Sequence, residues 1–126
     1  MDYLEAASIA IKSIKELVKL VRTLKHAANE CKGLLDELEI VAQLLVRPEY
    51  ELLGGQIPRD LKLGLEHLNE ELSSLYILLE SKIIRPGRFK LRNRLRWYWY
   101  SDKIKEYSQN VQKAAEGVRS AMTRAI

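Results

Sequence analysis

Basic residues gather in two places where their spacing could bind a polyanion. The first is a run over residues 82–96 that contains no acid and leads into Trp97-Tyr98-Trp99-Tyr100. Clustered bases attract anionic lipid by about 1 kcal/mol each, and Trp and Tyr favour the headgroup boundary. We therefore predict contact with anionic phospholipid through this run, with Trp97 and Trp99 as interface aromatics. The bases of the run are Lys82, Arg85, Arg88, Lys90, Arg92, Arg94 and Arg96.

Two other interpretations of the basic run stay open. It could be solvated surface that faces acids of the third predicted helix, in which case each pair contributes about 0–1 kcal/mol. It could also bind single-stranded nucleic acid, because bases stack on aromatic rings and Arg. No recognition helix, RNP motif or zinc site accompanies it, so nucleic acid is the less favoured partner. For Trp97, packing beneath the last helix is favoured over membrane contact.

A second basic cluster follows one side of the first predicted helix. Lys12, Lys15, Lys19 and Arg22 recur at spacings of 3, 4 and 3 residues, which places them in one stripe about 100° from the apolar seam. An apolar face flanked by bases is typical of an interfacial membrane helix, although a bundle helix with solvated lysines has the same pattern. Released from a bundle, about 23 helical residues would extend about 35 Å. That length is enough to cross a bilayer core, which is about 30 Å thick.

Residue sets that support catalysis or metal binding are missing. His26 and His67 lie far apart without ligand-type neighbours at motif spacing, and Gly54-Gly55 lacks the Lys-Ser/Thr of a phosphate-binding loop. Cys31, the single cysteine, falls on an apolar seam, as a core thiol does. We therefore expect no enzyme activity, no cofactor and no metal site.

Glycine and proline divide the chain into segments that would position these basic residues. One break lies at residues 48–58 and another at Pro86-Gly87, and Leu, Ala, Glu and Lys dominate elsewhere. This composition favours helix, and helices with apolar seams bury them together. The predicted fold is all-α, a four-helix bundle with helices at about 3–25, 29–46, 58–84 and 101–125.

The spacing of apolar residues sets these boundaries. The third segment has the clearest seam, with leucines at 61, 65, 68, 72, 75 and 79, the spacing of one buried helix face. The first seam slips near Leu24 and resumes at Ala28, so a break is predicted at 25–29. A single long helix with a stammer is the alternative. The last segment opens at Ser101-Asp102, a cap followed by an acid in the first turn.

Length, charge and cysteine content narrow the class of protein. The 126 residues suit one domain. The net charge of +4 conceals an acidic stretch, residues 48–81 with seven acids and two bases, and a basic one, residues 82–105 with nine bases and one acid. One cysteine excludes an internal disulfide and favours a reducing compartment, and no apolar run approaches about 18 residues. The seam still runs at Ala125-Ile126, so we expect residues 1–126 to be the N-terminal part of a larger protein.

Two blocks of the sequence resemble one domain family. The opening Met1-Asp2-x-Leu4-x-Ala6-Ala7-Ser8-Ile9-Ala10 is similar to the start of the HeLo-like (HET-S and HELL type) domains at the N-termini of fungal NOD-like (STAND) proteins. Arg94-Leu95-Arg96-Trp97, followed by Lys103-Ile104-Lys105-Glu106, resembles that family's entry into its last helix. The order of elements matches over nearly the whole chain. The four-helix domain of the mixed lineage kinase-like pseudokinase and plant resistance-protein helical domains look like distant relatives.

The resemblance implies a helical bundle that executes regulated cell death in innate immunity. Family members leave the cytoplasm for the plasma membrane after a NOD-like receptor is activated, self-associate there and permeabilise it through the N-terminal helix. The implied partners are further copies of the chain, anionic phospholipids, and an upstream receptor or amyloid-type signalling partner. The implied membrane-active residues are Leu4, Ala7, Ile11 and Ile14, to which we add Ile9, Lys12, Lys15, Lys19 and Arg22.

A second function class is a non-lytic oligomerisation or adaptor module. In that case the first helix would stay packed in the bundle, and the domain would dock onto itself or onto a partner helix. The sequence pattern alone does not separate the two classes, because both need an amphipathic first helix.

Overall fold

Helices make up nearly all of the chain that the structure describes. The structure is a computed structural model, and it describes residues 3–24, 27–46, 59–84 and 93–125. No strand occurs among these residues. The fold is therefore all-α, as predicted. Its helices are α1 (Tyr3–Thr23), α2 (Ala27–Glu30), α3 (Lys32–Leu45), α5 (Arg59–Leu79), α6 (Asn93–Trp99) and α7 (Ser101–Ala125), with a π-helical turn η1 (Glu80–Ile84) that extends α5.

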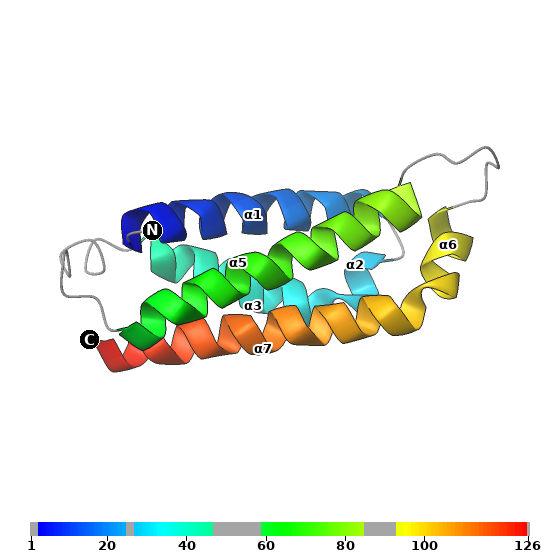
Figure 1. Cartoon of the computed structure of the whole chain (residues 1–126). Coiled ribbons are helices and arrows are strands. Elements are labelled where there is room, and N and C mark those ends of the chain that lie inside the picture. Colours follow the sequence, from blue (N-terminus) through cyan, green and yellow to red (C-terminus); the bar gives the residue numbers. More distant parts are fainter. Residues whose placement is uncertain (1–2, 25–26, 47–58, 85–92, 126) are drawn as a thin grey trace.

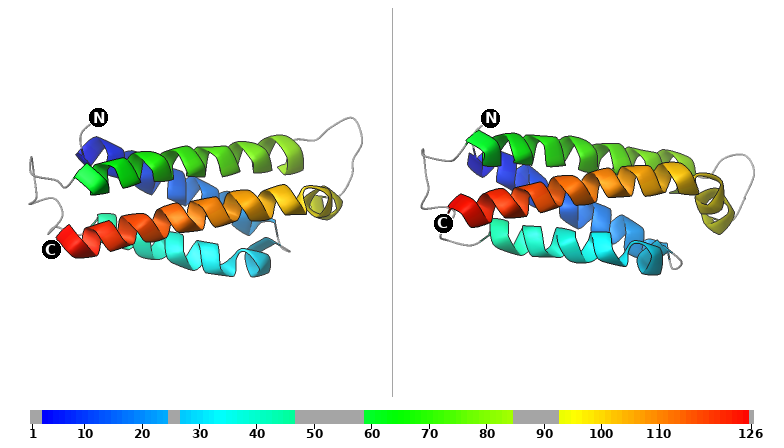
Figure 2. Two further views of the ribbon diagram at one scale, coloured as in Figure 1. Left: turned by 60° about the horizontal axis from the view of Figure 1, so that its bottom comes forward. Right: turned by 90° about the horizontal axis from the view of Figure 1, so that it is seen from below.

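The four long helices α1, α3, α5 and α7 run side by side along an elongated bundle (Figures 1 and 2). Around the bundle the order of neighbours is α1, α5, α7, α3. The pair α5 and α7 makes the most extensive contact, and α1 with α3 the least extensive of the four edges. In Figure 1, α1 and α5 run in one direction and α3 and α7 in the other. The α1/α3 edge is therefore the loosest side of the bundle.

The leucine seam of α5 forms the centre of the core. All six leucines predicted there are at most 1% exposed: Leu61, Leu65, Leu68, Leu72, Leu75 and Leu79. They share one helix face because they recur every three or four residues. Complete burial of a leucine side chain contributes about 1.5–3 kcal/mol. The same face holds α5 against both α7 and α1, its two principal neighbours.

The predicted break between the first two helices is confirmed. Helix α1 ends at Thr23, and α2 begins at Ala27. Leu24 turns into the core at 3% exposure, where its N–H donates to the Val21 carbonyl at 3.0 Å. A single long helix through this region is therefore excluded. The break comes earlier than predicted, since α1 stops before residue 25.

The second predicted helix corresponds to two successive helices, α2 and α3, which meet at a kink at Cys31. The Cys31 backbone has φ −101° and ψ 15°, which departs from α-helical values. The Cys31 N–H still donates to the Ala27 carbonyl at 2.9 Å, and the Leu35 N–H to Cys31 at 2.9 Å. The predicted bounds of 29–46 correspond to α2 and α3 together. The start was wrong by two residues because the turn at Leu24 closes sooner.

Helix α5 continues into a π-helical turn that keeps Ile83 fully buried. The turn ends at Ile84, the predicted end of the third helix. A π turn inserts an extra residue into the helix, which changes the face that the following residues present. Pro58, the predicted first residue, and Pro86-Gly87, the predicted stop, lie outside the described residues.

Helix α6 is an element that the sequence analysis missed. The residues before α7 were predicted to form a basic connection, whereas residues 93–99 are helical. The chain passes almost continuously from α6 into α7, since the Tyr100 N–H donates to Arg96 at 3.1 Å and the Ile104 N–H to Tyr100 at 2.8 Å. Helix α7 begins at Ser101, as predicted, with Asp102 in its first turn.

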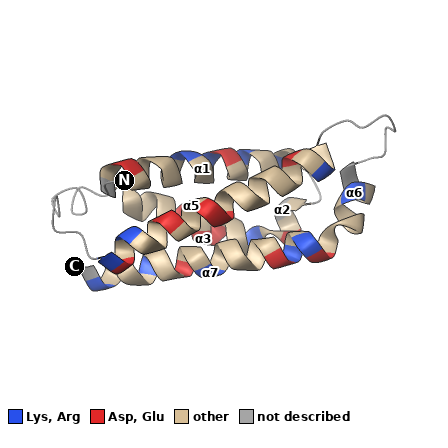
Figure 3. Ribbon diagram, viewed as in Figure 1, with Lys and Arg blue, Asp and Glu red and all other residues tan. Residues whose placement is uncertain are grey.

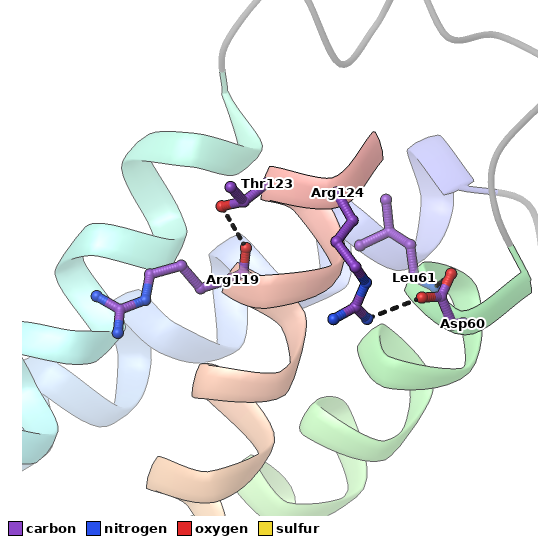
Figure 4. A network of polar contacts seen from close by, with 5 residues as sticks. All are labelled: Asp60, Leu61, Arg119, Thr123 and Arg124. Carbon is purple, nitrogen blue, oxygen red and sulfur yellow. Dashed lines mark hydrogen bonds and ion pairs between the residues drawn. The ribbon is translucent and has the colours of Figure 1, made fainter. Parts of the chain in front are cut away.

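Polar contacts tie α7 to α5 and α3 at one end of the bundle (Figure 4). Arg124 donates to Asp60 Oδ2 at 3.0 Å, and the Leu61 N–H donates to Asp60 Oδ1 at 3.0 Å. The Asp60 carboxylate therefore accepts a backbone N–H in the first turn of α5 and also binds Arg124 near the end of α7. Nearby, Arg119 forms an ion pair with the buried Glu37 at 3.2 Å. This second contact joins α7 to α3.

Candidate membrane-interaction surface

The two halves of α1 bury different kinds of side chain. In the N-terminal half the core face consists of Ala6, Ala7 and Ala10, which are at most 5% exposed. Large apolar side chains of that half point outward, with Leu4 62% and Ile9 37% exposed. The C-terminal half instead buries larger side chains, namely Ile14, Leu17, Val18 and Val21. The anchor of α1 in the core is therefore its second half.

The structure divides the predicted membrane-active residues into two groups. Ala7 and Ile14 belong to the core, and Ile11 is partly buried against it. Leu4 and Ile9 are exposed. The bundle as it stands presents only the exposed group to a membrane. The buried group can reach lipid only if α1 leaves its place.

Polar contacts between described residues fasten α1 to α5 and to α3. Asn69 of α5 donates its Nδ2–H to the Ala6 carbonyl at 3.3 Å, and Arg22 pairs with Glu39 of α3. Asn69 has a second polar atom, Oδ1, that is buried without a hydrogen-bond partner. Asn69 was not among the residues that the sequence predicted to matter. An amide directly after Leu68 in the leucine seam was the available signal.

The basic stripe of α1 lies on the outside of the bundle (Figure 3). Lys12, Lys15 and Lys19 are exposed, and none of them is within ion-pair distance of an acid among the described residues. Arg22 is also exposed, but its charge is paired with Glu39. Three of the four predicted bases therefore remain available for an anionic surface.

Only two members of the basic run can be placed with their side chains. Lys82 Nζ lies 6.0 Å from the centroid of the Tyr100 ring, and Arg96 donates to the Ile83 carbonyl at 3.4 Å. Both side chains therefore make contacts between η1 and the α6 region. Arg85, Arg88, Lys90 and Arg92 lie outside the described residues, as does the side chain of Arg94.

The two predicted interface tryptophans lie in different environments. Trp97 is 4% exposed, and its Nε1–H donates to Glu30 Oε2 at 2.6 Å. Its assignment to a membrane interface is therefore wrong for the bundle, and the competing prediction of a core position is confirmed. Trp99 is 70% exposed and its neighbour Tyr98 75%. With Leu95, 49% exposed, these two aromatics form the outer face of α6.

Metal-type clusters and the single thiol can be assessed among the described residues. No group of three or more His, Cys, Asp or Glu side chains among them could hold a metal ion. Burial raises the pKa of the Cys31 thiol to about 11, with a further contribution from the Glu30 carboxylate. A thiol with this pKa is almost entirely protonated at neutral pH. Cys31 is therefore a core residue, as predicted.

In the described parts of the chain, no helix combines the length and the apolar character that a membrane span requires. Comparison with known protein families, with curated proteins and with solved structures returned no match.

Proposed function

We propose that this chain is a cell-death execution domain that targets the plasma membrane, oligomerises there and permeabilises it through α1. The observation that carries the proposal is the unequal packing of α1. Its first half contributes small alanines to the core and keeps Leu4 and Ile9 outside. The domain would act after relocation from the cytoplasm, downstream of a NOD-like receptor or an amyloid-type signalling partner.

The energetics of α1 favour release from its N-terminal end. Burial of each methyl or methylene group contributes about 0.8 kcal/mol, and burial of a whole Ile or Leu side chain about 1.5–3 kcal/mol. Withdrawal of the three methyl groups of Ala6, Ala7 and Ala10 therefore costs about 2.4 kcal/mol, and withdrawal of the two side chains of Ile14 and Leu17 about 3–6 kcal/mol. The exposed Leu4 and Ile9 would gain apolar contact in lipid.

The charges on α1 indicate why release should accompany self-association. Lys12, Lys15, Glu16 and Lys19 would be expensive to bury singly in a bilayer core. In an oligomer they can face one another or a water-filled pore, which lowers that cost. Attraction of the lysine stripe and the basic run to anionic headgroups would first concentrate copies of the chain at the membrane.

A vesicle-leakage assay tests this function. The full chain, fused to an inducible dimerising domain to force self-association, is added to dye-loaded vesicles that contain phosphatidylserine or phosphoinositides. Dye release that requires both the inducer and the anionic lipid is expected. The absence of release under all these conditions would refute a membrane-permeabilising role.

Charge reversal in the basic run tests the lipid contact separately. We expect the four changes Arg88→Glu, Lys90→Glu, Arg92→Glu and Arg94→Glu to abolish co-sedimentation with anionic vesicles and to preserve helical content by circular dichroism. A matched control reverses four bases that are exposed elsewhere: Lys32→Glu, Arg59→Glu, Lys62→Glu and Lys113→Glu. Unchanged membrane recruitment of the first variant would exclude the basic run as the contact.

The non-lytic oligomerisation module is the alternative that a specific observation favours. Leu63 and Ile77 of α5 are 51% and 60% exposed, so this helix also presents apolar side chains to a partner. Light scattering combined with lipid co-sedimentation separates the two functions. Stable oligomers that do not bind lipid would favour the adaptor module.

Nucleic-acid binding is the third and least favoured role of the basic run, and gel shifts at low salt with single-stranded nucleic acid test it.

A further inference from the structure

An apolar groove follows the loose α1/α3 edge of the bundle. One depression of about 490 Å³ is lined by Leu4 and Ile11 of α1 and by Leu45 of α3. A second, of about 600 Å³, lies between Val18 of α1 and Ala42 of α3. Lys15 lines both depressions, so they adjoin. Each volume falls within the range of about 300–1,000 Å³ that is usual for small-molecule sites.

The rim of this groove is predominantly basic. Lys12 and Lys15 border the first depression together with Glu16, and Lys19 and Arg22 border the second together with Glu39. Arg22 and Glu39 neutralise each other as an ion pair. The uncompensated charge is therefore that of the three lysines, reduced by the single carboxylate of Glu16. A ligand that matches this groove has an apolar body and a negatively charged group.

We infer that the groove binds a single-chain anionic amphiphile, such as a fatty acid or a lysophosphatidate. Its acyl chain would lie on the apolar floor, and its headgroup would contact Lys15 and Lys19. From Leu4 to Arg22 the groove follows α1 for about 27 Å at the α-helical rise. One acyl chain spans half of a bilayer core, about 15 Å. The groove is therefore long enough for the chain and its headgroup.

A partner helix fits this groove less well than an acyl chain. A helix with its side chains is about 10 Å across and would need the wide concave surface of a helix-binding site. The two depressions instead have the volume of small-molecule sites, and apolar side chains that include Ile11, Ile14 and Val18 line them. The charge of the rim favours a ligand with one compact anionic end.

The inference goes beyond the proposed function and does not depend on it. The groove exists only while α1 lies beside α3, so ligand binding requires the closed bundle. A ligand that binds only this state stabilises it by mass action. The bound amphiphile should therefore raise the melting temperature of the domain, and it should oppose any departure of α1.

Calorimetric titration of the full chain with two lysolipids tests the site. Lysophosphatidic acid and lysophosphatidylcholine with the same acyl chain are used below their critical micelle concentrations, so that no membrane surface is present. We expect lysophosphatidic acid to bind about tenfold more tightly, because the lysines attract its net negative headgroup. Equal affinity for the two lipids, or no binding of either, would overturn the inference.

Variants locate the binding to the groove. Lys15→Glu with Lys19→Glu should weaken lysophosphatidic acid binding about tenfold and leave lysophosphatidylcholine unaffected. The control pair Lys103→Glu with Lys113→Glu makes the same charge change on exposed positions of α7 and should change neither affinity. An equal loss in both pairs would show that net charge, not the groove, attracts the lipid.

Two further variants test the apolar floor. Ala42→Phe should fill the second depression and weaken both lysolipids, with circular dichroism confirming that the bundle still folds. Val46→Asp is a second test that leaves the core alone, because Val46 is 57% exposed at the end of the first depression. Unchanged binding of both lysolipids to a folded Val46→Asp variant would contradict an acyl chain in the groove.

Discussion

Cys31 shows how burial decides the chemistry of a single residue. The thiol is 7% exposed at the kink between α2 and α3, and burial together with the Glu30 carboxylate raises its pKa to about 11. Both effects disfavour the thiolate, which is the reactive form. The residue therefore packs as a small apolar side chain with its thiol protonated at neutral pH.

Alkylation measures this protection directly. At about pH 8 we expect Cys31 in the folded domain to react with a thiol reagent at least roughly hundredfold more slowly than an ordinary cysteine, because so little thiolate is present. A Cys31→Ser/Ser120→Cys variant supplies the matched control, since Ser120 is exposed on α7. Equal rates at the two positions would contradict a buried thiol.

The leucine seam predicts a large effect of one truncation. Leu68 is fully buried, so Leu68→Ala should lower the free energy of unfolding by about 2–5 kcal/mol through lost burial and a residual cavity. Leu63 lies on the same helix but is 51% exposed, and Leu63→Ala should change it by less than about 0.5 kcal/mol. Urea denaturation of the two variants tests the burial pattern. Similar losses would mean that α5 is rotated relative to this structure.

Asp60 predicts a specific pH dependence. Its hydrogen bond from Arg124 lowers its pKa below the usual value of 3.8. A lowered pKa in the folded state stabilises the fold above the unfolded pKa, and this stabilisation is lost as the pH falls through the lower, folded value. Wild type should therefore be more stable than Asp60→Asn at neutral pH, and the difference should shrink below about pH 4. A stability difference that grows on acidification would contradict the contact.

At the scale of the elements, apolar periodicity together with the Gly/Pro breaks predicted most of the fold. The leucine spacing placed α5 and its buried face correctly, and the slip near Leu24 located the break after α1. The kink at Cys31 was not predictable, because it depends on a local backbone conformation that no residue type there demands. Neither Gly nor Pro occupies positions 27–32.

Helix α6 was missed because its stabilising contact is distant in sequence. Trp97 binds Glu30, which precedes it by 67 residues, and no periodic seam in the basic run reveals that pairing. The spacing of Trp97 and Tyr100 was the only local signal. The candidate surface was accordingly predicted in part: the lysine stripe and Trp99 are exposed, whereas Trp97 belongs to the core.

The ion pair between α3 and α7 gives an element-scale prediction. Glu37 is 8% exposed, and Arg119 is its partner at 3.2 Å. Arg119→Met should destabilise the bundle by about 1–3 kcal/mol, because it leaves a buried carboxylate without compensation. The double variant Arg119→Met/Glu37→Met should recover most of the lost stability, since two apolar side chains can replace a buried ion pair. Additive losses in thermal unfolding would show that the two residues do not interact.

At the scale of the whole molecule, the edges of the bundle differ in how extensively their helices pack. Helices α5 and α7 make the most extensive contact, whereas α1 meets α3 only weakly along its other edge. The loose edge carries the lysine stripe and the apolar groove. According to our two proposals, this edge holds a lipid-like ligand while the bundle is closed and opens when α1 departs.

The most direct test is a reversible tether between α1 and α5. Asn69 of α5 reaches the Ala6 carbonyl of α1, so the cysteines of Asn69→Cys and of Ile9→Cys, at an exposed position, can be joined by a flexible bis-maleimide. This reagent carries a disulfide in its spacer and does not need the tight geometry of a direct disulfide; the buried Cys31 thiol should not compete. Cross-linked protein, with α1 held to α5, should not release dye from anionic vesicles, and reduction of the spacer in the same sample should restore release. Dye release by the cross-linked form as strong as that after reduction would contradict our proposal that α1 leaves the bundle.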